Sequence, residues 1–145
     1  MTTNSKFLHS DISDSILKAF YIVRHVLPYD LDLDIYKRAL FLEMKAQGLT
    51  VTRDKEVDII FRDEKIGSFV IDFLVNDVIC VKIVNNDMTC EPYEADAKKQ
   101  LRLTKFEIYL LLNFSAETNQ QHSRVFLSND FKQKKDFSEN AESSE

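Results

Sequence analysis

A lone acidic residue lies inside an otherwise apolar stretch in the middle of the 145-residue chain. Asp72 interrupts the run 69–75, and Lys82 is the one charged residue of the next apolar run, 78–84. A carboxylate held among apolar side chains can bind a hard cation, and a neighbouring ammonium can stabilise developing negative charge. These two residues are therefore the first candidates for catalytic chemistry.

The turn between the two runs decides whether these side chains meet, and the residues leave two alternatives open. A loop of two residues, Asn76-Asp77, would place Asp72 and Lys82 on opposite faces of the hairpin. A loop of three residues, with Asn76 or Asp77 in the left-handed conformation, would place both on one face. In the second case they would form a buried ion pair.

The elements that must position this hairpin are three helices and five strands. Apolar residues at three- and four-residue steps predict helices, and alternation or continuous apolar runs predict strands. The expected helices are 11–27, 32–47 and 92–103, and the expected strands are 51–61, 69–75, 78–84, 106–114 and 125–127. This order predicts an α/β (α+β) fold with a mixed central sheet of about five strands, in which 78–114 forms a parallel strand–helix–strand unit.

The same pattern indicates one domain. Residues 11–130 carry the apolar periodicity, which is enough sequence for a hydrophobic core. Residues 1–10 are expected to be a flexible N-terminus, and residues 131–145, which contain few apolar side chains, a disordered tail.

The charge of the chain limits the function classes. A net charge of −5 and a pI near 5.2 argue against broad, non-specific binding of polyphosphates. A local basic patch is still predicted on the third helix, and it is the best candidate surface for a phosphate backbone or an acidic partner. Its members are Lys98, Lys99, Arg102 and Lys105.

Cysteine usage and hydropathy point to a cytoplasmic protein. Cys80 and Cys90 form neither a CxxC motif nor the framework of a secreted protein, so reduced thiols are expected. No apolar run approaches the ~18 residues of a membrane span, and residues 1–10 contain no signal-peptide apolar region. We therefore expect no membrane partner.

Over residues 11–128 the sequence resembles the GxxExxY proteins, a branch of the PD-(D/E)XK nuclease-like superfamily. The matching positions are Tyr36, Ala39-Leu40, Gly48-Leu49, Ile66-Gly67, Asp72, Asn113-Phe114 and Arg124. The resemblance implies a restriction-endonuclease-like core and hydrolysis of phosphodiesters with a divalent ion such as Mg²⁺.

The residues that depart from the family pattern stand at the positions that carry its catalytic motif. The glycine and glutamate of the family motif correspond to Asp30 and Leu33, the glutamate and lysine of the second strand to Lys82 and Val84, and the helix glutamine to Asp96. Asp72 survives and, with Lys82 and Tyr36, makes up a degenerate remnant of the catalytic site.

Three functions remain open. The first is a catalytically inactive nuclease-like domain that acts as a binding or structural module for nucleic acid or protein, or as a homodimer, with no cofactor. The second is a divergent Mg²⁺-dependent nuclease whose carboxylates have moved to Asp72, Asp96 and one of Asp30, Asp32 and Asp34. The third is a nucleic-acid-binding protein that does not cleave.

Overall fold

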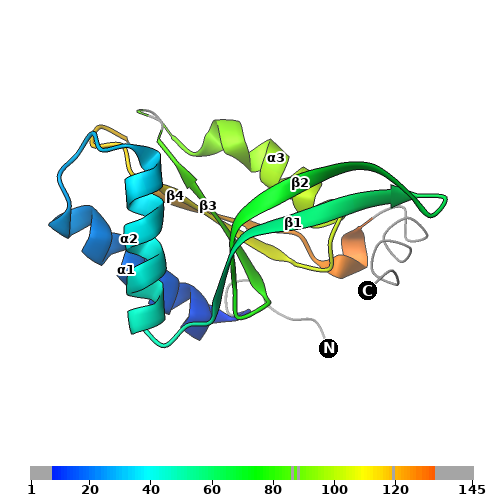
Figure 1. The fold of residues 1–145 in the computed structure, drawn as a ribbon, viewed down its shortest axis with the longest axis horizontal. Helices are drawn as coiled ribbons and strands as arrows, with labels where there is room; N and C mark the ends of the chain where they lie inside the picture. Colours follow the sequence, from blue (N-terminus) through cyan, green and yellow to red (C-terminus); the bar gives the residue numbers. More distant parts are fainter. Residues whose placement is uncertain (1–7, 86, 88, 119, 133–145) are drawn as a thin grey trace.

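The structure is a computed structural model that describes residues 8–85, 87, 89–118 and 120–132. Its elements follow the expected order of two helices, three strands, a helix and two strands (Figure 1). They are α1 (Ser10–Val26), α2 (Leu33–Ala46), β1 (Val51–Phe61), β2 (Glu64–Val75), β3 (Ile79–Val84), α3 (Glu91–Arg102), β4 (Ile108–Asn113) and β5 (His122–Phe126), followed by a short 3-10 turn, Asn129–Phe131.

The five strands form one mixed sheet in the order β1-β2-β3-β4-β5. Neighbouring strands are antiparallel except β3 and β4, which are parallel and are connected through α3. A parallel pair needs a long crossover, and α3 supplies it. The predicted fold class and the parallel unit at 78–114 are both confirmed.

The sheet is covered on both faces, which explains why the residues of β3 and β4 are almost all apolar. Helices α1 and α2 pack on one face, and Val81 and Ile83 point into that core. Helix α3 packs on the other face, against a second core that contains Cys80 and Val84. Strands buried on both faces lose the alternation of polar and apolar residues. Within the described residues, no helix combines the length and the apolarity needed to cross a bilayer.

Helix α2 ends as its sequence predicts, and its end sets the position of β1. Gly48 has a φ of +87°, a conformation that costs glycine little. Its N–H donates to the carbonyl of Lys45, and the N–H of Leu49 donates to that of Met44. The chain then enters β1 two residues later.

The β1–β2 hairpin is longer than the sequence suggested. The expected charged turn at 62–65 is a tight turn of two residues, Arg62 and Asp63, both with positive φ, and β2 already begins at Glu64. Primed turns of this kind match the twist of paired strands. A register shift at Ile59/Ile60 marks a bulge near the tip. Figure 1 shows the distal half of this hairpin projecting away from α1 and α2.

The ends of the domain differ slightly from the sequence-based boundaries. Strand β5 begins at His122, earlier than the expected 125. The fold continues beyond residue 130, because Lys132 is buried and its Nζ donates to the carbonyls of Thr104 and Phe106, each at 2.7 Å. Of the segments expected to be flexible or disordered, residues 1–7 and 133–145 lie outside the described residues.

Candidate functional site

The loop between β2 and β3 contains three residues. Val75 pairs with Ile79, and Asn76 and Asp77 have φ angles of 51° and 59°. The second of the two hairpin alternatives is therefore the right one. Continued at this register, the pairing would place Asp72 opposite Lys82 on the same face.

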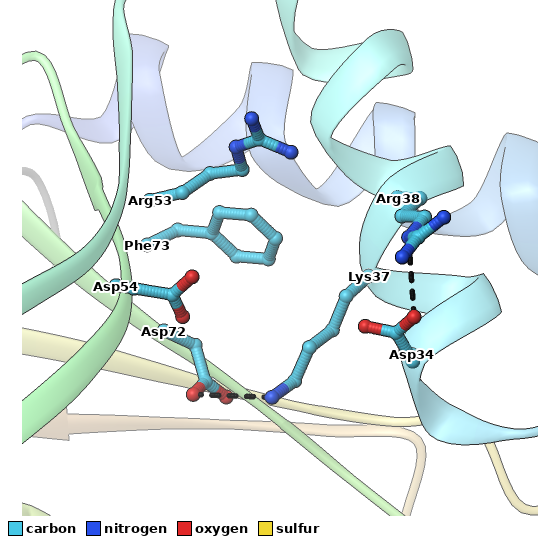
Figure 2. A pocket seen from close by; sticks show the side chains of 7 residues that line it. All are labelled: Asp34, Lys37, Arg38, Arg53, Asp54, Asp72 and Phe73. Carbon is cyan, nitrogen blue, oxygen red and sulfur yellow. Dashed lines mark hydrogen bonds and ion pairs between the residues drawn. The ribbon is translucent and has the colours of Figure 1, made fainter.

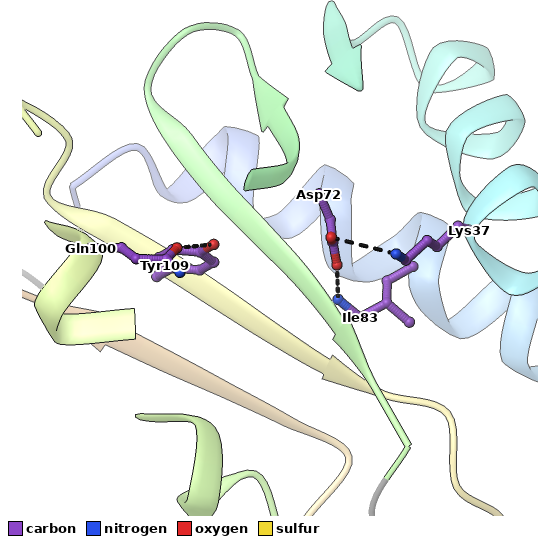
Figure 3. Close-up of polar contacts among 5 residues, drawn as sticks. All are labelled: Lys37, Asp72, Ile83, Gln100 and Tyr109. Atoms are coloured by element: carbon purple, nitrogen blue, oxygen red, sulfur yellow. Dashed lines mark hydrogen bonds and ion pairs between the residues drawn. The ribbon is translucent and has the colours of Figure 1, made fainter. Parts of the chain in front are cut away.

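The pairing stops one residue short of that position. The last pair of the β2–β3 ladder is Phe73–Val81, and beyond it β2 leaves β3. The Asp72 carboxylate fills the gap, because its Oδ2 accepts a hydrogen bond of 3.1 Å from the backbone N–H of Ile83 (Figure 3). Its Oδ1 lies 3.4 Å from the Nζ of Lys37, on α2. The side chain of Asp72 is 12% exposed, so both oxygens are held in a nearly buried position.

Lys82 does not pair with Asp72, although the three-residue loop was expected to bring the two side chains together. Within the described residues, the ion pair of Asp72 is with Lys37. Strand alternation groups Lys82 with Cys80 and Val84, which belong to the core beneath α3. The cation beside Asp72 therefore comes from α2, which lies outside the hairpin.

Asp72 and Lys37 line a cavity of about 420 Å³ between α2 and the base of the β1–β2 hairpin. Figure 2 shows its side chains converging from the two elements: Asp34, Lys37, Arg38, Arg53, Asp54, Asp72 and Phe73. Asp54 has a φ of 52° and kinks β1 at this point. The cavity is lined by three acids and three bases, so formal charges balance within it.

Two neighbouring contacts hold the basic residues of the cavity. Arg38 lies 3.1 Å from Asp34 in an exposed pair one helical turn apart. The Arg53 guanidinium stacks on the ring of Phe41, 4.2 Å from its centroid. Such a cation–π contact orients Arg53 along α2.

Tyr36 is a core residue of the described structure. It is 2% exposed, and its ring stacks on Phe114 at 4.5 Å. Its hydroxyl donates to the carbonyl of Pro28 at 2.5 Å and accepts from the N–H of Leu31 at 3.3 Å. These contacts fix the connector between α1 and α2. The structure does not bring Tyr36 together with Asp72 in the cavity.

The other proposed metal ligands are not assembled either. Asp96 is exposed on α3 and lies 3.9 Å from Lys99. Of the acids near the start of α2, Asp34 lines the cavity, whereas Asp30 and Asp32 are not among its lining residues. Across the described part of the chain, no group of three or more His, Cys, Asp or Glu residues has the geometry to hold a metal ion.

The predicted basic residues of the third helix are exposed, as a binding surface requires. Lys98, Lys99 and Arg102 lie on α3, and Lys105 follows it. The acidic residues of the same helix lie in its N-terminal half, and they are Glu91, Glu94 and Asp96. The three bases and three acids of α3 balance, so the helix presents little net charge to a polyanion.

A partly buried glutamine contact lies on the far side of the sheet from the Asp72 site. The hydroxyl of Tyr109 donates to Gln100 of α3 at 2.7 Å (Figure 3). Burial, the largest cause, and then the neighbouring Cys80 and the Asp72 carboxylate raise the pKa of Tyr109 well above its ordinary value. Tyr109 therefore stays a neutral hydrogen-bond donor.

The cysteines have no features of nucleophiles. Cys80 and Cys90 are free and buried. Burial raises the pKa of Cys80 to about 12 and that of Cys90 to about 11, so both remain neutral thiols at physiological pH. The reactive form of cysteine is the thiolate, which this burial suppresses.

Sequence reasoning missed Lys37, Arg53 and Asp54. The first had a recognisable signal, because Lys37 lies one helical turn after Leu33, the position where the family resemblance places a glutamate. Asp54 had no such signal, because it is the β1–β2 register of the structure, with Arg53 opposite Phe73 and Lys55 opposite Ile71, that places it beside Asp72.

Comparison with known proteins agrees with this architecture. A family model of the PD-(D/E)XK nuclease superfamily matches residues 10–125. No curated protein and no solved structure matches the chain significantly. The matched region contains both helices over the first core, the hairpin with Asp72, and the α3 crossover. The chain belongs to the PD-(D/E)XK nuclease superfamily.

Proposed function

We propose that this nuclease-fold domain has lost metal-dependent cleavage and serves as a binding or structural module. The observation that carries the proposal is the Lys37 ammonium 3.4 Å from Oδ1 of Asp72. A metal ion would need the Asp72 carboxylate as a ligand, and the Lys37 ammonium already places a positive charge there. We also assign the chain to the GxxExxY branch of the superfamily, on the motif positions that it retains.

The donor set around Asp72 argues against Mg²⁺. This ion binds oxygen ligands in octahedral geometry, commonly one or two carboxylates with water and phosphate oxygens. Asp72 offers one carboxylate, with one oxygen on Lys37 and the other on the N–H of Ile83. The strand position that would supply a catalytic lysine holds Val84, which is 2% exposed in the second core. These residues do not fit a metal-dependent hydrolase.

A divergent nuclease is the second candidate, and one observation favours it. Asp54 and Asp34 line the same cavity as Asp72, so further carboxylates are close to the surviving acid. Use of this set would require Lys37 to leave Asp72 and Arg38 to leave Asp34, with which it pairs at 3.1 Å.

Nucleic-acid binding without cleavage is the third candidate. It is supported by the exposure of Lys98, Lys99, Arg102 and Lys105. The acids in the N-terminal half of α3 and the net charge of −5 weaken it, because counterion release requires surplus cations. Salt-dependent binding of duplex DNA that is lost in Lys98→Glu/Lys99→Glu would favour this candidate over a protein-binding role.

Metal binding and cleavage test the main proposal together. Calorimetry with Mn²⁺ and Mg²⁺ should detect no binding to the wild type, and supercoiled DNA should not be nicked with either ion. Nicking that requires a metal and disappears in Asp72→Asn would refute the proposal.

A gain-of-ligand variant sharpens this test. Lys37→Glu removes the ammonium and brings a second carboxylate toward Asp72, so Mn²⁺ binding should appear. The matched control is Lys18→Glu, which makes the same charge change at an exposed position of α1 outside the cavity and leaves the Lys37–Asp72 pair in place. If both variants bind Mn²⁺ equally, Lys37 is not the group that excludes the ion.

A further inference from the structure

The distal half of the β1–β2 hairpin, residues 55–71, has two unequal faces, and we call this segment the arm. Its inner face carries Val57 and Phe69, which pair across the strands and pack on the second core. Its outer face is open to solvent. The arm projects beyond the sheet on the side opposite α1 and α2 in Figure 1. The inner face accounts for its attachment to the domain, and the outer face has no such role.

The outer face of the arm combines exposed apolar side chains with acids. Strand alternation puts Val70 on this face, where it is 50% exposed, and Ile66, which lies at the bulge near the tip, is 62% exposed. Glu56 lies directly across from Val70. Lys65 bridges Glu56 and Asp58 at 3.5 Å and 3.4 Å, which leaves this cluster with a net negative charge.

Helix α2 presents a complementary ridge to solvent. Ile35 and Leu42, which are 44% and 66% exposed, lie two turns apart on one side of the helix. Arg38 and Lys45 lie on the same side, at helical steps of three and four residues from these two. A rise of about 1.5 Å per residue separates the two apolar residues by roughly 10 Å. Ile66 and Val70 are separated by a similar distance, about 13 Å along the strand.

We propose that the outer face of the arm packs on the α2 ridge of a second copy of this chain, in a two-fold symmetric dimer. The apolar–acidic face and the apolar–basic face are both on this one chain, so each copy supplies the surface that the other lacks. Two-fold symmetry forms the contact twice and closes the assembly. Both faces consist of apolar residues beside charges of opposite sign, which suits an interface with a polar rim.

The free edge of β1 is a poorer place for two copies to meet. Asp54, the fourth of the eleven residues of β1, has a φ of 52° and interrupts this edge. An antiparallel pairing about a two-fold axis sets the central residue against its own copy. Centred on Lys55, it would oppose two ammonium groups and set Asp54 against Glu56. Like charges across a strand pair are destabilising.

The contact at Arg38 does not prevent this assembly. Arg38 pairs with Asp34, but both side chains are more than two-thirds exposed. Exposed pairs of this kind contribute little to stability, so Arg38 can exchange partners at an interface. Neither Lys37 nor Asp72 takes part in the proposed contact, so the dimer is independent of the proposed loss of cleavage.

Complementary charge reversal provides a sharp test by sedimentation velocity. The arm variant is Glu56→Lys/Asp58→Lys, and the ridge variant is Arg38→Glu/Lys45→Glu. Wild type should sediment as a species of twice the 16.9 kDa chain mass at high micromolar concentration. Each variant alone should be monomeric, because like charges then meet in both contacts. An equimolar mixture should form a heterodimer, because both of its contacts again join opposite charges.

A matched control and three outcomes make the test decisive. Glu117→Lys/Asp130→Lys makes the same charge change as the arm variant at exposed positions outside both faces, and it should dimerise like wild type. Circular dichroism verifies that each variant is folded. The proposal is overturned if wild type stays monomeric, if the arm and ridge variants still dimerise alone, or if their mixture does not associate.

Discussion

Lys37 of α2 and Asp72 of β2 form an ion pair with 3.4 Å between Nζ and Oδ1, although 35 positions separate them in the chain. Oδ2 of the same carboxylate accepts from the Ile83 N–H at the point where β2 leaves β3. One acid thus links α2, β2 and β3. In a metal-dependent nuclease, a cation-binding acid must be available to the ion.

Replacement of Lys37 by methionine should destabilise the fold by about 1–3 kcal/mol, because it leaves the nearly buried Asp72 carboxylate without its cation. The cost is below that of a fully buried pair because Lys37 is 33% exposed. Asp72→Asn keeps an oxygen that can accept from Ile83. In that background, Lys37→Met should cost about 1 kcal/mol less. Urea unfolding of the wild type, the two single variants and the double variant measures this coupling. If the losses of stability are additive, the two side chains do not interact.

Tyr36→Phe should cost about 1–2 kcal/mol and leave the fold intact, because it removes the hydrogen bonds to Pro28 and Leu31 but keeps the ring on Phe114. Tyr36→Ala should cost about 3–5 kcal/mol, since it also leaves a cavity. Tyr29→Phe, at a residue 55% exposed, is the control and should lie within about 0.5 kcal/mol of wild type. Thermal or urea unfolding measures all three. A Tyr36→Phe variant as stable as wild type would show that the connector does not depend on this hydroxyl.

Truncation should reveal the true end of the domain. A chain that ends at Lys132 should be as stable as the full chain, whereas one that ends at Asp130 should lose stability. Lys132 is buried, and its Nζ donates to the carbonyls of Thr104 and Phe106. Lys132→Met should therefore cost about 1–3 kcal/mol through two carbonyls left without this donor. Urea unfolding midpoints report each loss, and equal midpoints for the two truncations would refute the anchoring role.

Stability should fall as the pH is lowered below neutrality, in part through His122. Desolvation lowers the pKa of His122 from its ordinary value of 6.5, and its Nδ1 lies 2.8 Å from the Tyr21 hydroxyl. The unfolded chain then binds the proton more tightly than the folded one. The stability contributed by neutral His122 is complete above pH 6.5 and is lost as pH falls through the lower folded pKa. Urea titrations at several pH values should show a weaker dependence in His122→Gln. His25→Gln makes the same substitution at an exposed position and is the matched control for loss of an imidazole.

Local rules determined much of the fold from the sequence. Helical periodicity, Pro28 and Gly48 fixed both ends of the first two helices to within a few residues, because these signals act through the backbone itself. Continuous apolar runs at β3 and β4 predicted strands covered on both faces, which the two cores confirm. The missing carboxylate on β3 was also visible, since Lys82 and Val84 can be read directly from the chain.

Only the tertiary structure decided which groups surround Asp72. Hairpin geometry placed Lys82 opposite the acid, but the strands separate after Phe73–Val81, and a helix supplies Lys37 instead. The kink at Asp54 and the position of α2 over the sheet also follow from packing between distant segments. A sequence specifies its local hydrogen bonds through neighbouring residues, whereas a side-chain contact across 35 positions depends on how whole elements pack.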